Sequence, residues 1–514
     1  MNIQRCIVRV ESLGCRINQA EAEAFASLCI DAGFSVCTAD SDRFCSGIPL
    51  KQTASAAVPH DFCIAAPSFS GSIGEDTVLC LVNTCTVTGK AEQKARRLLR
   101  LLVKAHPHAV ILVTGCYAQL NAADIEALHP HIISFPGQQK DLLTSVPAFL
   151  AGLLEKSAYF DTLLFLTGLR EYLTDCLKQN AKPDGTTPAE AQTIQAVSSA
   201  ENTAFFGLNA SRFLFHSRAL LKIQDGCNEA CAYCRIRLAR GKSVSLPASE
   251  VIDRIKRIEA TGVAELTLSG VNLSQYRSNA GDFAGLLELI LQHTHIRLRI
   301  SSLYPDRIDA ALIPLLAHPR ICPHFHLSVQ SGSNRILKAM HRSYLRETVY
   351  HATAELRRVK ENPFIGADII TGFPGETEQD FEETYRMCKN LRFAGIHAFP
   401  FSARPGTEAW KMQPKVPERI AGARTKKLNE LAAIQSAAYR ASWDGKELYG
   451  VIEAPRQEAC TVVTENYLSF PLTGTETAPL PRLRGGEYAL VRICGDHAEL
   501  RWLSNFADKA SSKS

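Results

Sequence analysis

Short apolar runs alternate with amphipathic helical patterns over the first third of the chain. This alternation of strand and helix is typical of a parallel α/β sheet. We therefore predict an N-terminal α/β domain over residues 1–150. The strands are expected at 8–13, 78–83 and 109–114, and the helices at 19–32 and 91–105.

The same alternation resumes after residue 216 and predicts a second α/β domain over 216–442. Six apolar runs are separated by helical patterns, so we expect a partial (β/α)6 barrel with its site at the carboxyl ends of the strands. A basic helix over 416–442 would end the domain. The six strand candidates are 219–224, 264–269, 296–301, 324–329, 364–370 and 394–400.

The remaining segments differ in pattern. Residues 38–76 lack periodicity and predict an insertion or surface loop, and 151–215 predict a linker with one helix near 163–177. The tail, residues 443–514, predicts a small β-barrel of the OB type. Its strand candidates are 448–451, 460–463, 488–493 and 498–502.

Composition narrows the class of protein. The chain has 514 residues, of which 46% are hydrophobic, and it contains 17 cysteines. It shows no signal-peptide pattern and no apolar stretch of about 18 residues, so a membrane span is not expected. Disulfide frameworks are typical of short secreted chains, so a chain of this length is expected to have free cysteines. We therefore expect it in the reducing cytoplasm.

The formal net charge is only +5, so general attraction to nucleic acid is not evident. Basic residues nevertheless cluster locally, and each cluster is either a contact surface or simply a solvated helix face. The clusters are Lys90, Lys94, Arg96, Arg97 and Arg100; Arg235, Arg237, Arg240 and Lys242; and Arg419, Arg424, Lys426 and Lys427.

Cys227, Cys231 and Cys234 form a C-x3-C-x2-C motif directly after the first barrel strand. Three cysteines would hold a [4Fe-4S] cluster while leaving one iron open to a small molecule. A zinc knuckle is the alternative, but zinc needs a fourth ligand and no Cys or His follows at a suitable short spacing. The motif resembles the signature of the radical S-adenosylmethionine (SAM) enzymes, in which the cofactor chelates the open iron.

Cys15, Cys85 and Cys116 each follow a predicted strand of the first domain. The carboxyl ends of parallel strands share one edge of a sheet, so these three thiols can converge there. Three unrelated buried cysteines are the alternative that spacing alone favours.

The surrounding residues resemble the methylthiotransferase family over most of the chain. The tail resembles the TRAM domain, an RNA-binding module, and the stretches 221–227 and 239–247 are most similar to the branch that modifies N6-threonylcarbamoyladenosine beside the anticodon of tRNA. The motifs that carry the resemblance are 13–19, 83–91, 114–119, 269–273, 326–333, 368–377 and 402–407.

The resemblance implies two [4Fe-4S] clusters and two uses of SAM. One SAM would methylate sulfur at the cluster held by Cys15, Cys85 and Cys116, and another would yield a 5′-deoxyadenosyl radical at the second cluster. A low-potential electron donor and a sulfur source are then required. The residues expected to contact SAM, with strand-end capping as the alternative for the last three, are Tyr233, Gly270, Asn272, Ser302, Gln330 and Asp368.

At two positions the sequence departs from the family pattern, so the resemblance does not fix the details of the pocket. Residues 234–238 lack the usual proline-containing stretch, and Tyr304 stands where an acidic residue is common. From Leu448 to Ser514 the tail carries seven Lys or Arg against eight Asp or Glu, so tRNA attraction is assigned mainly to the basic helix. The alternatives are isopentenyladenosine in tRNA, a ribosomal-protein aspartate, or a non-catalytic iron–sulfur RNA-binding protein; a monomer is the default expectation.

Overall fold

The computed structural model describes residues 3–38, 41–45, 63–64, 76–157, 159–180, 203–210, 212–456, 459–474, 480 and 483–504. The chain divides into two units. The first comprises Met1–Phe215 with Leu238–Pro247, and the second comprises His216–Arg237 with Ala248–Ser514. Among the residues just named, no helix has the length and apolar character needed to cross a membrane.

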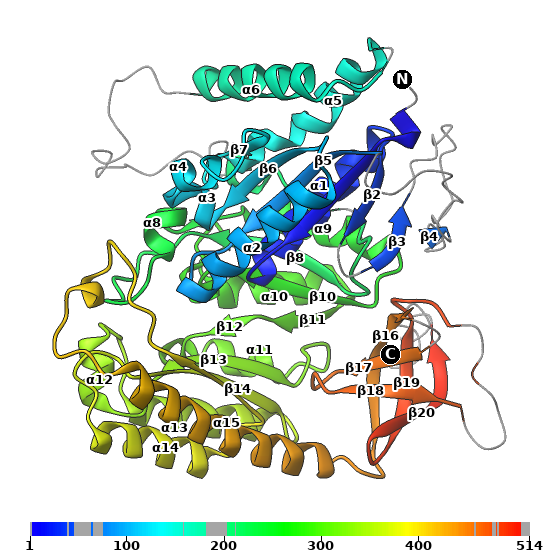
Figure 1. Cartoon of the computed structure of the whole chain (residues 1–514). Coiled ribbons are helices and arrows are strands. Elements are labelled where there is room, and N and C mark those ends of the chain that lie inside the picture. Colours follow the sequence, from blue (N-terminus) through cyan, green and yellow to red (C-terminus); the bar gives the residue numbers. More distant parts are fainter. Residues whose placement is uncertain are drawn as a thin grey trace. The chain divides into compact units, whose positions relative to one another are not determined.

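The first unit is built on a sheet in the order β4-β3-β2-β1-β5-β6-β7 (Figure 1). Neighbouring strands from β2 to β7 pair in parallel, which confirms the parallel α/β prediction, whereas β3 pairs antiparallel with both β2 and β4. The strands are β1 (Ile7–Ser12), β2 (Ser35–Thr38), β3 (Ser41–Cys45), β4 (Cys63–Ile64), β5 (Thr77–Thr84), β6 (Val110–Gly115) and β7 (Ile132–Ser134). The strands β3 and β4 fall within residues 38–76, so the prediction of an irregular loop there was wrong at these two strands.

Helices cover both faces of this sheet. Leu81 of β5 packs with Phe25 of α1, while its neighbour Val82 packs with Leu99 of α2 in a separate core. A strand buried on both faces has a continuous apolar run, which is the pattern the sequence shows here. The helices are α1 (Arg16–Asp31), α2 (Gly89–Ala105), α3 (Cys116–Leu120), α4 (Ala122–Glu126), α5 (Val146–Glu155) and α6 (Thr162–Gln179); α8 (Ile236–Arg240) and β9 (Val244–Ser245) lie further along the chain.

The end of the 151–215 segment is part of this core. Leu208 and Ala210 are buried against it. The fully buried carboxylate of Glu23 accepts hydrogen bonds from the backbone N–H groups of Leu214 and Phe215, at 2.8 and 2.9 Å. A buried carboxylate needs such donors, so the segment is fixed to the first unit rather than acting as a free linker.

The second unit contains the partial barrel expected from the sequence. Strands follow the order β8-β10-β11 and then β12-β13-β14-β15, with Ser301 separating β11 from β12. Neighbouring strands within each sheet are parallel. The strands are β8 (Ala219–Asp225), β10 (Glu265–Gly270), β11 (Arg297–Ile300), β12 (Ser302–Leu303), β13 (His324–Gln330), β14 (Phe364–Thr371) and β15 (Gly395–Pro400).

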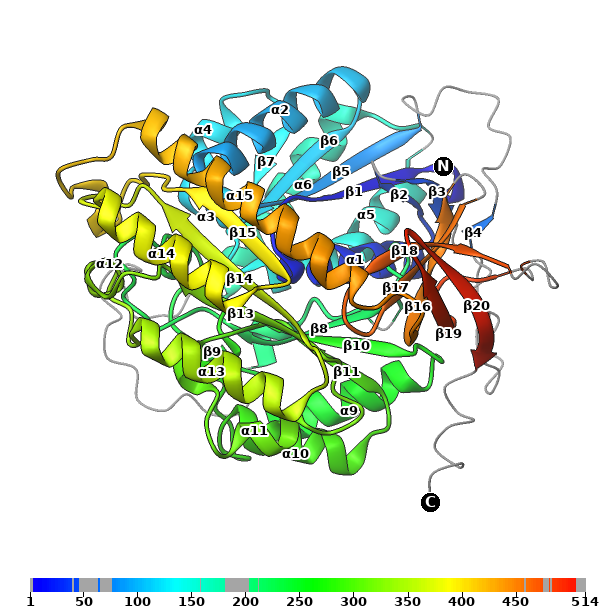
Figure 2. The same ribbon diagram turned by 90° about the horizontal axis from the view of Figure 1, so that it is seen from below.

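Helices line the outer side of these strands, as Figure 2 shows for α10, α11, α13 and α14. The basic helix predicted at 416–442 is α15, and it packs against β14 and β15. The helices are α9 (Ala248–Glu259), α10 (Phe283–His293), α11 (Leu312–Leu316), α12 (Asn334–Ala339), α13 (Arg346–Val359), α14 (Glu378–Leu391) and α15 (Glu418–Ala441).

The C-terminal strands close into a small barrel in the order β16-β17-β18-β20-β19. The sequence predicted all of these strands except β18, whose Pro471 argues against a strand. In the structure Pro471 lies on the exposed face of β18, between the buried residues Phe470 and Leu472. The strands are β16 (Glu447–Arg456), β17 (Ala459–Thr464), β18 (Ser469–Thr473), β19 (Tyr488–Cys494) and β20 (His497–Ser504).

A buried ion pair ties this small barrel to the β/α barrel. Arg299 donates to both oxygens of Glu265, at 2.6 and 2.8 Å, and also to the carbonyl oxygens of Thr464 and Glu465. Burial opposes the charge on Glu265, but Arg299 lowers the pKa of this carboxyl group to about 2. The pair therefore stabilises the fold fully above pH 4.5 and loses this contribution as the pH falls toward 2.

Glu265→Gln is expected to destabilise the protein by about 3–5 kcal/mol, because the charge of Arg299 would remain buried without its partner. Chemical denaturation at pH 7 would measure the loss. Glu355→Gln is the matched control, since Glu355 pairs with exposed Arg358 on α13 and its loss should change little. Equal effects of the two substitutions would contradict the structural importance of the buried pair.

Candidate functional site

The first cysteine set lies at one edge of the N-terminal sheet. Cys15, Cys85 and Cys116 follow β1, β5 and β6, which are neighbours in that sheet. A Cβ atom added to Gly14 would lie 2.6 Å from Cβ of Cys85, so the ends of β1 and β5 approach closely. Cys85 and Cys116 are buried, and Cys15 is exposed. The structure thus brings together the three thiols that the sequence predicted to converge.

Gly115 makes the turn before Cys116 possible. Its φ of 94° lies in the left-handed region, and an added Cβ would stand 2.4 Å from both Oδ1 of Asn83 and the carbonyl oxygen of Thr84. Only glycine combines this backbone conformation with so little space. Gly115 therefore sets the direction in which Cys116 leaves its strand.

A buried arginine touches this cysteine set. Arg240 donates from Nε to Sγ of Cys116 at 3.2 Å and from Nη2 to Oδ1 of Asn18 at 2.9 Å. Asn18 also lies 3.3 Å from Sγ of Cys15, which donates to it. The sequence analysis missed this role and grouped Arg240 with a basic surface cluster, because its partners are more than one hundred residues away in the chain.

A buried carboxylate balances the charge of Arg240. Glu21 lies 3.6 Å from Nη1 of Arg240 and 2.6 Å from Nζ of Lys140, and it accepts from Asn83 at 3.0 Å. Burial raises the pKa of the Cys15 and Cys85 thiols, and Arg240 lowers it without cancelling that effect. Arg240 thus offsets part of the cost of forming thiolate, the form that binds iron.

The second cysteine set lies in the loop that follows β8. Gly226, with a φ of 67°, turns the chain into the loop that holds Cys227, Cys231 and Cys234. The backbone N–H groups of Glu229 and Ile236 donate to Sγ of Cys227 and Cys234, both at 3.4 Å. Backbone donors aimed at sulfur are a common feature of iron–sulfur sites.

The third sulfur of this set is approached by a guanidinium group. Arg342 donates to Sγ of Cys231 at 3.3 Å and to the hydroxyl group of Tyr304 at 2.9 Å. Its guanidinium lies 4.1 Å from the ring centre of Tyr304 and 4.8 Å from that of Tyr344. Tyr304 thus contacts the Arg342 guanidinium through both its ring and its hydroxyl group.

The predicted SAM contacts occupy the same end of the barrel. Gly270 is required by space, since an added Cβ would lie 2.8 Å from Leu273 and 3.0 Å from Oε1 of Gln224. Asn272 faces Cys227, with Nδ2 at 3.9 Å from Sγ, and its buried Oδ1 has no partner among the described residues. Tyr233 packs beside the loop on an apolar cluster that includes Phe373. A buried oxygen without a partner is suited to a ligand.

The other predicted contacts lie on β12, β13 and β14. Gln330 ends β13 with a φ of 70°, a strained conformation for this residue that often marks a functional position. Ser302 is the ladder partner of His326. Both carboxylate oxygens of Asp368 face histidines, with Oδ2 3.0 Å from His326 and Oδ1 3.5 Å from His397.

The donor chemistry fits iron–sulfur clusters in both places. Each set offers three thiols, flanking N–H donors, and one guanidinium group that contacts sulfur. Thiolate ligands with hydrogen-bonded sulfurs are what such clusters require. The first set gains its cation from Arg240 and the second from Arg342.

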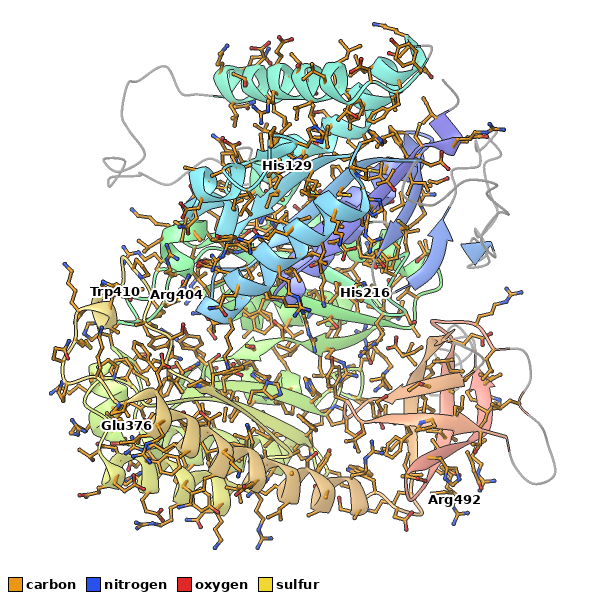
Figure 3. All side chains as sticks on the ribbon, viewed as in Figure 1. His129, His216, Glu376, Arg404, Trp410 and Arg492 are labelled. Atoms are coloured by element: carbon orange, nitrogen blue, oxygen red, sulfur yellow. The ribbon has the colours of Figure 1, made fainter. Side chains whose placement is uncertain are left out.

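The basic helix α15 is less available to a partner than its sequence implies. Arg424 is buried and pairs with Glu376, labelled in Figure 3, at 2.6 Å and with Glu378 at 3.0 Å. The expectation that Arg424 attracts tRNA is therefore corrected, because its charge is already neutralised inside the unit. Lys426 remains 81% exposed, and Lys427 lies 4.5 Å from the ring centre of Tyr385.

Comparison with known proteins identifies the class. Residues 221–388 match the model of the radical SAM superfamily, and residues 71–137 match that of the uncharacterized protein family UPF0004. The chain is 49% identical to the threonylcarbamoyladenosine tRNA methylthiotransferase MtaB of Treponema pallidum (strain Nichols), over 96% of this chain and 98% of that protein.

More distant relatives carry related names. The MtaB protein of Aquifex aeolicus (strain VF5) is 31% identical over 91% of this chain and 97% of its own. A tRNA-2-methylthio-N(6)-dimethylallyladenosine synthase of Moorella thermoacetica is 29% identical over 93% of this chain and 95% of its own. The chain belongs to the radical SAM methylthiotransferase family and is an enzyme that transfers a sulfur-containing group.

Gly115→Ala is expected to lower stability by more than about 1 kcal/mol, since it adds both steric overlap and a disfavoured φ. Thermal unfolding would measure the change. Gly152→Ala on α5 is the control, because an added Cβ there meets nothing within 4 Å and should stabilise the helix slightly. A tolerated Gly115→Ala variant would contradict the close approach described at the strand end.

Proposed function

We propose that this enzyme transfers a methylthio group to C2 of N6-threonylcarbamoyladenosine beside the anticodon of tRNA. The observation that carries the proposal is the 49% identity to a relative with this substrate in its name, over nearly the full length of both chains. Two separate sets of three thiols support it, because the reaction needs one site for radical formation and one for sulfur.

We assign a [4Fe-4S] cluster to each cysteine set. Cys227, Cys231 and Cys234 would hold the cluster whose open iron binds SAM, and Cys15, Cys85 and Cys116 would hold the cluster that carries sulfur. When bound, these groups supply the radical and methyl-transfer chemistry, which acid–base side chains cannot supply at the unreactive C2–H bond.

The residues of the chain hold and tune these groups. Arg342 and Arg240 each donate to a cysteine sulfur, and such hydrogen bonds stabilise the reduced form of a cluster. We assign the contacts with SAM to residues around the second set, and Asp368 is not among them because histidines already occupy its oxygens. The proposed contacts are Tyr233, Gly270, Asn272, Ser302 and Gln330.

Several requirements follow from this chemistry. A low-potential electron donor must reduce the cluster that binds SAM, and a sulfur source must restore the transferred atom. Reduced thiols and a tRNA substrate both fit the cytoplasm, and action as a monomer remains the proposal for assembly. The phosphates of tRNA would be met by exposed basic residues, because phosphate contacts dominate affinity for nucleic acids.

Expression in a host that lacks its own methylthiotransferases, followed by mass spectrometry of tRNA nucleosides, tests the function. The wild-type chain is expected to produce methylthio-threonylcarbamoyladenosine, and Cys227→Ala is expected to abolish it. Cys176→Ala on α6, outside both sets, is the matched control. A methylthio group on isopentenyladenosine or on ribosomal protein instead would replace the proposed substrate.

Iron content tests the two clusters separately from turnover. Anaerobically reconstituted enzyme is expected to bind about eight iron atoms, and removal of either cysteine set should leave about four. Without Cys15, Cys85 and Cys116, SAM cleavage should persist while methylthio transfer is lost. Four irons in the wild-type chain would contradict the two-cluster assignment.

Reversing the charge of Arg419 and Lys426 together is expected to weaken tRNA binding. The slope of log K against log salt concentration should become shallower by about one for each lost phosphate contact. Both residues are exposed on α15. Filter binding over a range of salt concentrations would measure this effect. Unchanged affinity and slope would exclude this face of α15 from the tRNA interface.

A further inference from the structure

A polar cluster lies on three adjacent barrel strands and includes none of the six cysteines of the two sets. His326 of β13, Asp368 of β14 and His397 of β15 present ligand atoms that all lie within 4.8 Å of one another. Their neighbours Leu327 and Ile369 are fully buried on the opposite side of the strands, where the helices pack. Because side chains alternate along a strand, the three polar groups face the interior of the barrel.

Two glycines open space for this cluster. A Cβ atom on Gly366 would stand 3.0 Å from Nδ1 of His326, and one on Gly395 would stand 2.9 Å from the ring of Phe364. These glycines flank each other in the ladder, since Gly366 pairs with both His326 and Gly395. The ring of His326 can therefore extend over Gly366 toward Asp368. Asp368 lies two residues beyond Gly366 on β14, nearer the carboxyl end of the strand.

Asp368 orients both imidazole rings and leaves one of them open. His326 is mostly covered, whereas 56% of the side chain of His397 is exposed. The hydrogen bond with Asp368 raises the pKa of His397, so this ring is more readily protonated than usual. Nδ1 of His397 faces Asp368, which leaves Nε2 as a donor directed away from the pair.

The cluster shares a strand with the contacts of the second cysteine set. Ser328 lies two residues beyond His326 on the same side of β13, or about 7 Å along the strand. Its carbonyl oxygen accepts from Arg342, which also donates to Sγ of Cys231. A substrate that places its reacting atom near this cysteine loop and directs a substituent into the barrel would therefore present that substituent to the cluster along β13.

The proposed substrate has such a substituent. In adenine, C2 and C6 flank the same ring nitrogen, so a group on N6 extends from the edge that carries the reacting carbon. Threonylcarbamoyl ends in a carboxylate and a hydroxyl group, whereas the dimethylallyl group in the name of the Moorella relative is purely apolar. A polar cluster in the barrel matches the first substituent, whereas the second would leave Nε2 of His397 without a partner.

We propose that His326, Asp368 and His397 form a binding site for the amino-acid end of the N6-threonylcarbamoyl group, with His397 donating to its carboxylate. This inference rests on the proposed function and deepens it. His397 is the residue that touches substrate, while Asp368 and His326 position it. Asp368 thereby serves the nucleoside rather than SAM.

The test compares two anticodon stem-loop RNAs, one with N6-threonylcarbamoyladenosine and one with its methyl ester, which lacks the carboxylate charge. Cluster-loaded wild-type enzyme is expected to bind the acid about 10- to 100-fold more tightly than the ester, the range for a hydrogen bond to a charged group. His397→Gln should reduce this preference to nearly one, with iron content and unfolding midpoint as checks on folding. His351→Gln on the exposed side of α13 should retain the wild-type preference.

The possible outcomes distinguish a failure of this binding site from a failure of the proposed function. If wild-type enzyme does not methylthiolate the acid RNA, the proposed function falls and the inference falls with it. If wild-type enzyme modifies that RNA but His397→Gln keeps the full preference for the acid, only the inference is overturned. If the wild-type enzyme holds one divalent ion other than iron and His326→Ala loses it, the cluster is a metal site and the inference is overturned.

Discussion

The carboxyl ends of parallel strands are the constraint on which both cysteine sets depend. Neighbouring parallel strands end along one edge, so residues that are far apart in sequence, such as Cys15 and Cys116, meet there. Gly14 and Gly115 allow the close approach because a Cβ atom would overlap the next strand. The barrel applies the same rule differently, since one loop after β8 supplies all three cysteines.

Buried charges accompany each of these arrangements. Arg240 reaches Cys116, and Arg342 reaches Cys231, each through a hydrogen bond to sulfur. A buried guanidinium is costly unless it is paired, so Glu21 balances Arg240, and tyrosine rings cover Arg342. Arg240 offsets part of the burial that raises the pKa of Cys15 and Cys85, and both guanidinium groups would offset the negative charge of a cluster. The same side chains would therefore serve both folding and the binding of iron.

Much of this could be predicted from the sequence, because strands buried on both faces have continuous apolar runs and both cysteine sets follow such runs. The partial barrel, its six strands and the convergence of Cys15, Cys85 and Cys116 were predicted for these reasons. Arg240 and Arg424 were misread as surface cations. Their partners Cys116 and Glu376 are separated from them by 124 and 48 residues, so no local pattern could reveal the pairing.

Substrate choice cannot come from the fold alone. Relatives named for threonylcarbamoyl and dimethylallyl substituents align with this chain over more than nine-tenths of its length. A shared fold leaves selection to side chains that face the substrate. A polar site is effective for this purpose, because an apolar group would leave Nε2 of His397 without a partner, whereas an apolar pocket rejects a polar group only weakly. The direction of selectivity thus follows from which side chains line the barrel, while the radical chemistry remains common to both kinds of enzyme.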